Sequence, residues 1–89
     1  MQHFVNQIAF ITGAGSGIGR ATALAFTKAG ARVVVSDINE AGGAETVQQI
    51  RELGGDATFI TCDVADPAQV EAAVRQTIET YGRLDIGIN

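Results

Sequence analysis

The sequence predicts an α/β fold in which the strands of a parallel sheet alternate with helices. Short runs rich in apolar and β-branched residues recur along the 89 residues, and segments with helical spacing separate them. Each of these segments carries a start or a stop signal for a helix. The resulting order is strand then helix, three times over, followed by a fourth strand. This order is typical of a parallel sheet with right-handed crossover connections.

The first strand is expected at Gln7–Thr12, which is apolar on both faces, as a central parallel strand is. Four of the eleven glycines follow at every second position in the stretch Thr12-Gly13-Ala14-Gly15-Ser16-Gly17-Ile18-Gly19. A helix is expected over Ile18–Ala29, because Gly30 is suited to a left-handed stop after it. Its apolar positions have helical spacing: Ile18, Ala21, Leu24, Ala25 and Phe26.

The second strand is expected at Ala31–Ser36, with Asp37 at its carboxyl end. Asn39 is expected to cap the second helix, and the third strand follows at Ala57–Cys62. The pair Gly42-Gly43 weakens the first turn of this helix by about 1 kcal/mol each relative to Ala. Nothing in the sequence accounts for that pair. The expected apolar stripe of the helix is Ala44, Val47, Ile50 and Leu53.

The third helix has the clearest boundary signals. Asp66 is suited to the N-cap, Pro67 to the first helical position, and Gln69 is placed to close a capping box. Gly82 is expected to end the helix, and the fourth strand is expected at Leu84–Asn89.

A doubly wound sheet of these strands has the order 3-2-1-4, with two helices on one face and the third helix on the other. The sequence ends at Asn89, within strand-like residues. The third helix alone would leave its face thinly covered and the fourth strand as an unprotected edge. We therefore expect an incomplete sheet, the N-terminal half of a larger protein, whose remainder, a second copy or another chain covers that face. The isolated chain is expected to aggregate, oligomerise or be partly molten.

Composition excludes several classes of function. A net charge of −4 disfavours nucleic acid and anionic membranes as partners. The chain has no apolar run long enough for a transmembrane helix, and Met1-Gln2-His3 does not begin like a signal peptide. The single cysteine, Cys62, excludes an internal disulfide and fits a reducing compartment, so the cytoplasm is expected.

The glycine-rich turn is suited to binding phosphate. The first N–H groups of the following helix lack partners within the helix, and the helix dipole places about half a positive charge there. A phosphate or pyrophosphate is the natural ligand of such a helix end. Glycines let its oxygens approach the backbone, and the hydroxyl of Ser16 could hold a phosphate or a ribose.

Further candidate ligand residues follow the other strands. Asp37 lies 18 residues after Gly19, where a carboxylate can accept hydrogen bonds from both ribose hydroxyls of an adenosine. It would repel a 2′-phosphate, and neither Ile38 nor Ser16 supplies a positive charge, so the sequence favours NAD over NADP. The adenine edge is expected to meet Asp63 and Val64 after the third strand, and Asn89 follows the fourth.

Structural readings of these residues stay open. The glycine turn could be a tight connection, Asp37 a strand-end or capping residue, and Asp63 a solvated loop acid. Asp85 is expected to be structural, or a lip of the adenine pocket, rather than catalytic. An S-adenosylmethionine-dependent methyltransferase also uses a glycine-rich first turn and an acid after the second strand. Such enzymes usually place an acid before the glycines, where this chain has Ile11 and Thr12.

At this point the chain resembles the short-chain dehydrogenase/reductases, which carry a TGxxxGxG motif on a Rossmann-type fold. Thr12 to Gly19 matches that motif, and Leu84–Asn89 looks like the lead into the family's NNAG motif. Four further stretches fit in order: Gly30-Ala31 with the valine run, Ser36-Asp37, Cys62-Asp63-Val64 and Gly82-Arg83-Leu84-Asp85-Ile86. The resemblance covers essentially the whole chain.

The resemblance implies an NAD(H)-dependent oxidoreductase that acts on a small-molecule alcohol or carbonyl and forms a homo-oligomer. It implies that Gly13, Ser16, Gly17, Ile18 and Gly19 hold the pyrophosphate and ribose, that Asp37 and Ile38 flank the adenosine ribose, and that Asp63, Val64 and Asn89 line the adenine side. No catalytic residue is predicted in these 89 residues, because no position matches the family's catalytic Ser, Tyr and Lys. No metal site is predicted either. We expect the chain to hold the adenosine half of NAD and to be inactive alone. A non-catalytic NAD-binding or NAD-sensing module is the alternative.

Overall fold

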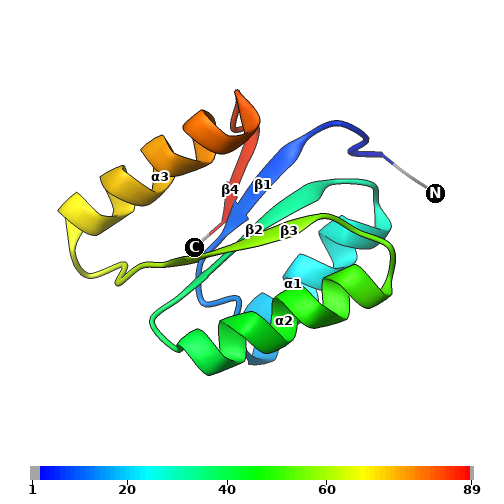
Figure 1. Ribbon diagram of the computed structural model, residues 1–89, viewed down its shortest axis with the longest axis horizontal. Coiled ribbons are helices and arrows are strands. Elements are labelled where there is room, and N and C mark those ends of the chain that lie inside the picture. Colours follow the sequence, from blue (N-terminus) through cyan, green and yellow to red (C-terminus); the bar gives the residue numbers. More distant parts are fainter. Residues whose placement is uncertain (1–2, 89) are drawn as a thin grey trace.

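The computed structural model describes residues 3–88, which fold as alternating strands and helices (Figure 1). The element types and their order agree with those expected from the sequence. The elements are β1 Ile8–Ile11, α1 Gly17–Lys28, β2 Arg32–Asp37, α2 Glu40–Glu52, β3 Ala57–Thr61, α3 Pro67–Tyr81 and β4 Ile86–Ile88.

The four strands form one parallel sheet in the order β3-β2-β1-β4, which confirms the predicted strand order. β1 lies at the centre, with Phe10 opposite Val34 of β2 on one side and opposite Gly87 of β4 on the other. The chain leaves β1 toward β2 and later returns to β1 from the other side. The winding therefore reverses at β1, and the glycine turn that follows β1 lies at this reversal.

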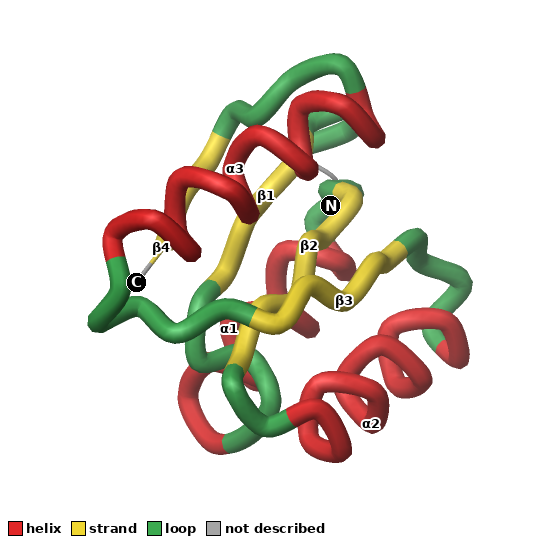
Figure 2. The backbone as a smooth tube through the Cα atoms, turned by 60° about the vertical axis from the view of Figure 1, so that its left-hand side comes forward, coloured by secondary structure: helices red, strands yellow, loops and turns green. Residues whose placement is uncertain are grey.

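The helices cover the two faces of the sheet unequally, as Figure 2 shows from the side. α1 and α2 pack on one face, where Ala23 and Ile50 join the side chains of alternate strand positions such as Val33 and Val35. α3 covers the other face, where Ala73 packs with Val34 and its neighbours. Each central strand is therefore buried on both faces, which explains its continuous apolar sequence.

Local signals set the start of α2 and both ends of α3, as the sequence predicts. The Asn39 side chain accepts a hydrogen bond from the Gly42 N–H at 3.0 Å and caps α2. Asp66 caps α3 by accepting from the Ala68 N–H at 3.0 Å. Gly82 adopts a left-handed conformation with φ of +82°, which favours glycine, and its N–H donates to the carbonyl of Ile78.

One local expectation for α3 and one for α2 are wrong. Gln69 does not close the capping box on Asp66, because its Oε1 accepts from the N–H of Asp63 instead, at 2.9 Å. On α2, Ala44 and Leu53 are exposed, and the buried stripe runs through Gly43, Thr46, Val47 and Ile50. A search for apolar side chains misses this stripe, since half of its positions are glycine or threonine.

The structure accounts for the glycine pair of α2 through close approach. A Cβ atom at Gly42 would lie 2.5 Å from the carbonyl oxygen of Gly15. A Cβ atom at Gly43 would overlap the ring of Phe59. The first turn of α2 thus lies directly against the glycine-rich loop and β3, at a separation that only hydrogen side chains permit.

Asp85 has a structural position and is not among the residues that line the pocket at the ends of β2 and β3. Its Oδ2 accepts from the Ile8 N–H at 2.8 Å, and its own N–H donates to the Ile8 carbonyl at 3.0 Å. Arg83 binds the same carboxylate with two nitrogens, at 2.6–2.9 Å for the shortest contact of each. These bonds join the start of β4 to the start of β1. They lie at the amino ends of the strands, whereas the glycine turn follows the carboxyl end of β1.

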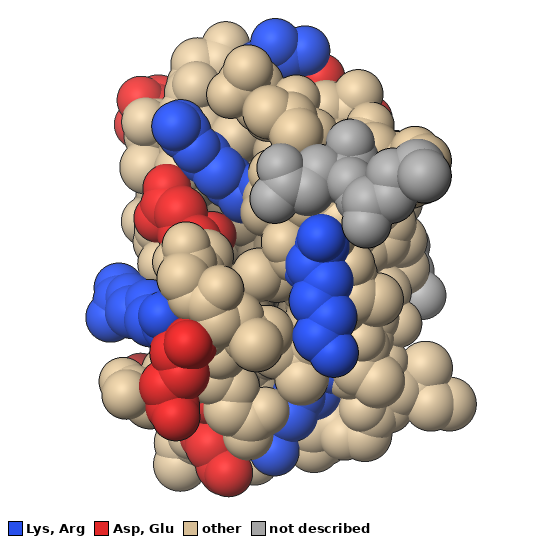
Figure 3. Space-filling model, turned by 90° about the vertical axis from the view of Figure 1, so that its right-hand side faces the viewer, with Lys and Arg blue, Asp and Glu red and all other residues tan. Residues whose placement is uncertain are grey.

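Within residues 3–88, no helix combines the length and the apolar content needed to cross a membrane. Basic and acidic side chains are interspersed on the face drawn in Figure 3, so charges of one sign do not form a continuous patch over its described residues.

Candidate functional site

The candidate site lies at the carboxyl edge of the sheet, next to the point where the winding reverses. A small pocket of about 110 Å³ opens there between the glycine turn and the ends of β2 and β3. Its lining is Gly13, Asp37, Ile38, Cys62, Asp63 and Val64. Two larger hollows, of about 260 and 240 Å³, lie elsewhere, beside the ends of α1 and α2. The small pocket collects residues from three separate loops, as expected of a binding site at a topological switch point.

The glycine turn owes its shape to its glycines. Gly13 and Gly17 adopt φ values of +62° and +55°, which residues with a side chain rarely adopt. Gly19 lies so close to Gly13 that a Cβ atom there would overlap the Gly13 carbonyl group. The turn therefore folds back onto the first turn of α1, with Ala14 and Gly15 buried and Gly13, Ser16 and Gly17 exposed.

The N-terminus of α1 differs from those of α2 and α3 because it has no side-chain cap among the described residues. Within the described residues, the Ser16 side chain makes no capping hydrogen bond, and the first turn of α1 has no acidic residue. Ile18 is 87% exposed, so it does not belong to the buried face of α1 as its apolar character predicts. The first N–H groups of this helix are left to an outside acceptor, and the helix dipole favours an anion there.

Asp37 connects the end of β2 to the glycine turn. Its Oδ2 accepts from the backbone N–H of Gly15 at 2.8 Å, and its Oδ1 accepts from the N–H of Asn39 at 3.0 Å. A carboxylate has about four lone-pair positions, so these two bonds leave capacity for two more donors. Asp37 is half-buried, and Ile38 beside it is 66% exposed.

The loop after β3 brings Asp63 and Val64 into the lining of the same pocket. The Oδ1 of Asp63 accepts from the N–H of Ala65 at 2.9 Å, and the Asp63 N–H donates to Gln69. Gln69 in turn donates to the Oδ2 of Asp66 at 3.2 Å. Val64 is 56% exposed, so its side chain is free to meet a ligand.

The sequence-predicted residues therefore fall into two groups. Gly13, Asp37, Ile38, Asp63 and Val64 line one pocket. Ser16, Gly17, Ile18 and Gly19 lie at the start of α1, outside that lining but continuous with it through the turn. Asn89 lies outside the described residues.

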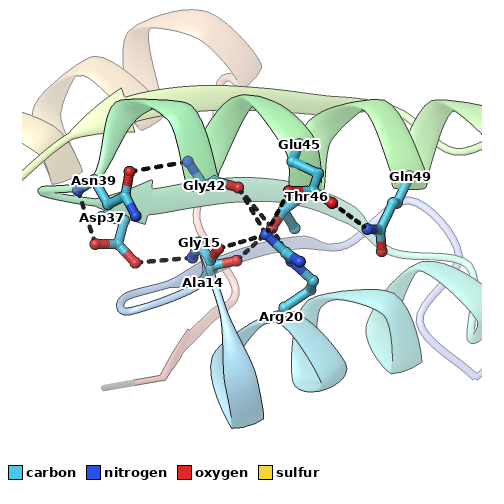
Figure 4. A network of polar contacts seen from close by, with 9 residues as sticks. All are labelled: Ala14, Gly15, Arg20, Asp37, Asn39, Gly42, Glu45, Thr46 and Gln49. Atoms are coloured by element: carbon cyan, nitrogen blue, oxygen red, sulfur yellow. Dashed lines mark hydrogen bonds and ion pairs between the residues drawn. The ribbon is translucent and has the colours of Figure 1, made fainter.

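Arg20 and Thr46 bind backbone carbonyls of the glycine turn and are not expected from the sequence (Figure 4). Arg20 donates to the Gly15 carbonyl at 2.6 Å, to the Gly42 carbonyl at 3.2 Å and to the Thr46 hydroxyl at 2.9 Å. The Thr46 hydroxyl lies 2.7 Å from the carbonyl oxygen of Ala14. A sequence signal for Arg20 exists, because it lies three and seven residues before Ala23 and Thr27, the buried positions of α1.

Among residues 3–88, no group of three or more His, Cys, Asp or Glu side chains is arranged to hold a metal ion. The described site combines a helix N-terminus, a carboxylate at a strand end and a second acidic residue that lines the same small pocket. Such an arrangement can hold an anion beside a hydroxylated, hydrogen-bonding group.

Comparison with known proteins agrees with this geometry. A family model described as short chain dehydrogenase matches residues 7–89. An uncharacterized oxidoreductase of Thermotoga maritima is 49% identical over 87 residues, which cover 98% of this chain and 34% of that protein.

Two solved structures are also similar. The crystal structure of a hydroxysteroid dehydrogenase from Escherichia coli matches with a TM-score of 0.93 and 41% identity, over 97% of this chain and 37% of that one. A short chain dehydrogenase/reductase from Burkholderia phymatum in complex with NAD matches with a TM-score of 0.90 and 36% identity, over 98% and 31%. The chain thus spans about a third of the length of these relatives.

Proposed function

The chain belongs to the short-chain dehydrogenase family, and from this premise we propose that it binds the adenosine half of NAD(H) for an oxidoreductase that acts on alcohols or carbonyls. The observation that carries the proposal is the position of Asp37, which is hydrogen-bonded to the glycine turn and lines the same pocket as Asp63. The NAD complex of the Burkholderia phymatum relative, similar over 98% of this chain, adds support.

The start of α1 is proposed to hold the pyrophosphate. Its N–H groups lack a side-chain cap within the described residues, and no acidic residue in its first turn repels an anion. The glycine backbone allows phosphate oxygens to come within hydrogen-bond distance. Ser16, Gly17, Ile18 and Gly19 supply this end of the site, and Gly13 joins it to the pocket.

Asp37 is proposed to bind the adenosine ribose through the acceptor positions that Gly15 and Asn39 leave open. Its negative charge would repel a 2′-phosphate, so the proposal specifies NAD rather than NADP. Arg20, the basic residue described beside the turn, directs its guanidinium at two backbone carbonyls and Thr46 rather than at the pocket.

Asp63 and Val64 are proposed to contact the adenine. The Asp63 carboxylate can accept from the exocyclic amine, and the Val64 N–H can donate to a ring nitrogen. Ile38 is exposed on the ribose side of the same pocket, where it offers an apolar surface to the adenosine. Asn89 is proposed to line the adenine side as well, because Leu84–Asn89 resembles the lead into the family's NNAG motif.

NAD supplies the hydride acceptor or donor when it is bound. These residues bind and orient its adenosine half, and no residue of this chain is assigned to acid–base catalysis. We therefore propose residues 1–89 as an NAD-binding portion that is inactive alone, in keeping with its third of the length of its relatives. The proposal extends to a homo-oligomeric parent enzyme in the cytoplasm, where the single cysteine would stay reduced.

Thermal denaturation of the protein in the presence of NAD⁺, NADP⁺ or S-adenosylmethionine tests this proposal. A ligand that binds the native state raises the melting temperature by mass action, and saturation at 100 times Kd stabilises by about 2.7 kcal/mol. We expect NAD⁺ to raise the melting temperature most and NADP⁺ less. A rise with S-adenosylmethionine and none with NAD⁺ would overturn the proposal.

A further inference from the structure

We infer that Arg20 and Thr46 are positioning residues, which set the ribose-binding orientation of Asp37 through one peptide group of the glycine turn. The inference rests on the proposed function, since it assigns a purpose to contacts around the proposed ribose site. Neither residue lines the pocket. Both contact backbone groups of the glycine turn, as Figure 4 shows.

The contacts form a continuous chain of hydrogen bonds. The Arg20 Nε donates to the Thr46 hydroxyl at 2.9 Å. That hydroxyl donates to the Ala14 carbonyl at 2.7 Å, and the N–H of the same peptide group, at Gly15, donates to the Asp37 Oδ2 at 2.8 Å. The term Arg20 relay denotes Arg20, Thr46, the Ala14–Gly15 peptide group and Asp37.

The direction of the relay follows from the chemistry of the hydroxyl. Arg20 has no acceptor atom, so the Thr46 oxygen must accept from it and use its single hydrogen elsewhere. Two carbonyls are within reach, Ala14 at 2.7 Å and Gly42 at 3.1 Å. Arg20 itself donates to the Gly42 carbonyl, so the shorter bond to Ala14 is the natural destination of the hydrogen.

Burial makes these bonds strong determinants of geometry. Thr46 is fully buried, and the Arg20 side chain is only 22% exposed. Water competes weakly for such groups, and successive hydrogen bonds polarise one another in a low-dielectric region. Arg20 also binds the Gly15 carbonyl, so both peptide groups flanking the α-carbon of Gly15 are held.

A turn built on glycine needs this support. Gly15 has no side chain to restrict its peptide groups, and a Cβ atom there would lie 2.7 Å from the Asp37 carboxylate. Gly15 cannot carry a side chain of its own on the side that faces Asp37, so the support on the other side of the turn comes from Arg20 of α1 and Thr46 of α2. The carboxylate is thereby oriented before a ribose arrives, and the cost of ordering it on binding is reduced.

Thr46→Val tests the relay, because it removes the hydroxyl and nearly preserves the side-chain volume. The matched control is Thr77→Val, since Thr77 is equally buried and its hydroxyl donates to Ala73 within α3. Thr46→Ser retains the hydroxyl and should restore the wild-type behaviour. Arg20→Lys keeps the charge on a partly exposed side chain but cannot serve the three acceptors at once.

The first measurement is the proton chemical shift of the Gly15 amide in the ligand-free full-length protein. We expect Thr46→Val and Arg20→Lys to move it upfield, as its bond to Asp37 weakens, and Thr46→Ser and Thr77→Val to leave it in place. An unchanged Gly15 resonance in Thr46→Val overturns the relay. This measurement does not require that the protein bind NAD, so it separates failure of the relay from failure of the proposed function.

The second measurement is a double-mutant cycle on NAD⁺ affinity by calorimetry. We expect Thr46→Val to weaken binding about five- to tenfold, the worth of roughly one hydrogen bond. In an Asp37→Ala background the same change should have little further effect, because its route to the ribose is gone. Equal losses in both backgrounds would show that Thr46 acts independently of Asp37 and would overturn the inference. Absence of NAD⁺ binding by the wild type would instead refute the proposed function.

Discussion

The Asp37 carboxylate accepts the backbone N–H of Gly15 at 2.8 Å, across 22 residues of sequence. The bond joins the end of β2 to the turn that follows β1. A carboxylate in this position is part of the turn as well as a group available to a ligand. Changes at Asp37 are therefore expected to affect both the shape of the turn and the choice of ligand.

The first prediction concerns selectivity between NAD⁺ and NADP⁺. Asp37→Asn keeps an oxygen that can accept from Gly15 but removes the negative charge. We expect NAD⁺ affinity to fall about tenfold, because a charge-assisted bond to the ribose is worth roughly 1.5–3 kcal/mol and is only partly replaced. NADP⁺ affinity should fall less or rise, because the repulsion of its 2′-phosphate disappears.

Calorimetric titration of both nucleotides measures this change in ratio. Asp56→Asn is the matched control. Asp56 is an exposed aspartate just before β3 that pairs with Arg32, and it does not line the pocket. An Asp37→Asn variant with the wild-type ratio of the two affinities would remove Asp37 from the ribose role.

The second prediction concerns Gly42, whose place in α2 the sequence does not explain. Gly42→Ala adds a Cβ atom 2.5 Å from the Gly15 carbonyl oxygen, and that atom belongs to backbone that Arg20 also holds. We expect the free energy of unfolding to fall by about 1–3 kcal/mol, as overpacking at a rigid contact does. NAD⁺ affinity should fall with it, since the turn must shift.

Urea denaturation and NAD⁺ titration of the same variant check both effects. Gly87→Ala serves as the control, because nothing lies within 4 Å of a Cβ atom placed there. Unchanged stability and affinity in Gly42→Ala would mean that α2 and the turn move apart freely.

Much of the fold was predictable because its signals are local. Asn39, Asp66 and Gly82 act within one turn of chain, and each was assigned its capping position from the sequence. Strand order followed from the alternation of elements. The buried face of α2 was not predictable in the same way, because Gly43 and Thr46 are buried by what packs on them, the Phe59 ring and the glycine turn.

The site was predictable only where a residue follows a strand. Asp37 ends β2 and Asp63 lies in the loop directly after β3, so the topology alone places them at one end of the sheet. Arg20 and Thr46 lie on helices, and their contacts depend on how α1 packs against α2. The spacing of Gln69 suits a capping box with Asp66. Its Oε1 instead accepts from the Asp63 N–H, which also lies within its reach.

The third prediction concerns recognition of adenine. Gln69 accepts from the Asp63 N–H and donates to Asp66, so it holds the loop that carries the Asp63 carboxylate. Gln69→Leu should loosen this loop and reduce the preference for NAD⁺ over its hypoxanthine analogue, which lacks the exocyclic amine. We expect the ratio of the two affinities to fall about threefold or more, the effect of roughly 0.7 kcal/mol.

Competition binding of the two dinucleotides measures that ratio. Gln76→Leu, an exposed change on the same helix, should leave it unaltered. A preference for NAD⁺ that persists in Gln69→Leu would show that the loop keeps its shape without this side chain.

The last prediction concerns acid stability and Asp85. Hydrogen bonds from Arg83, then from the Ile8 N–H, hold the pKa of the Asp85 carboxyl below its ordinary value. The unfolded chain therefore binds a proton at a higher pH than the native chain does, and unfolding takes up that proton. Stability that Asp85 contributes is present above the ordinary pKa of an aspartate and is lost as pH falls toward the lower native value.

Urea denaturation from about pH 6 to about pH 3 follows this loss. The free energy of unfolding should fall less steeply with decreasing pH in Asp85→Asn than in the wild type. Glu79→Gln removes one exposed carboxylate from α3 and controls for the change in net charge. If Asp85→Asn and the wild type lose stability with the same slope, the bonds from Arg83 and Ile8 do not favour the ionised carboxylate in the native protein. The contact between β4 and β1 would then owe its stability to the backbone hydrogen bonds between the two strands, among them the bond from Asp85 to the Ile8 carbonyl.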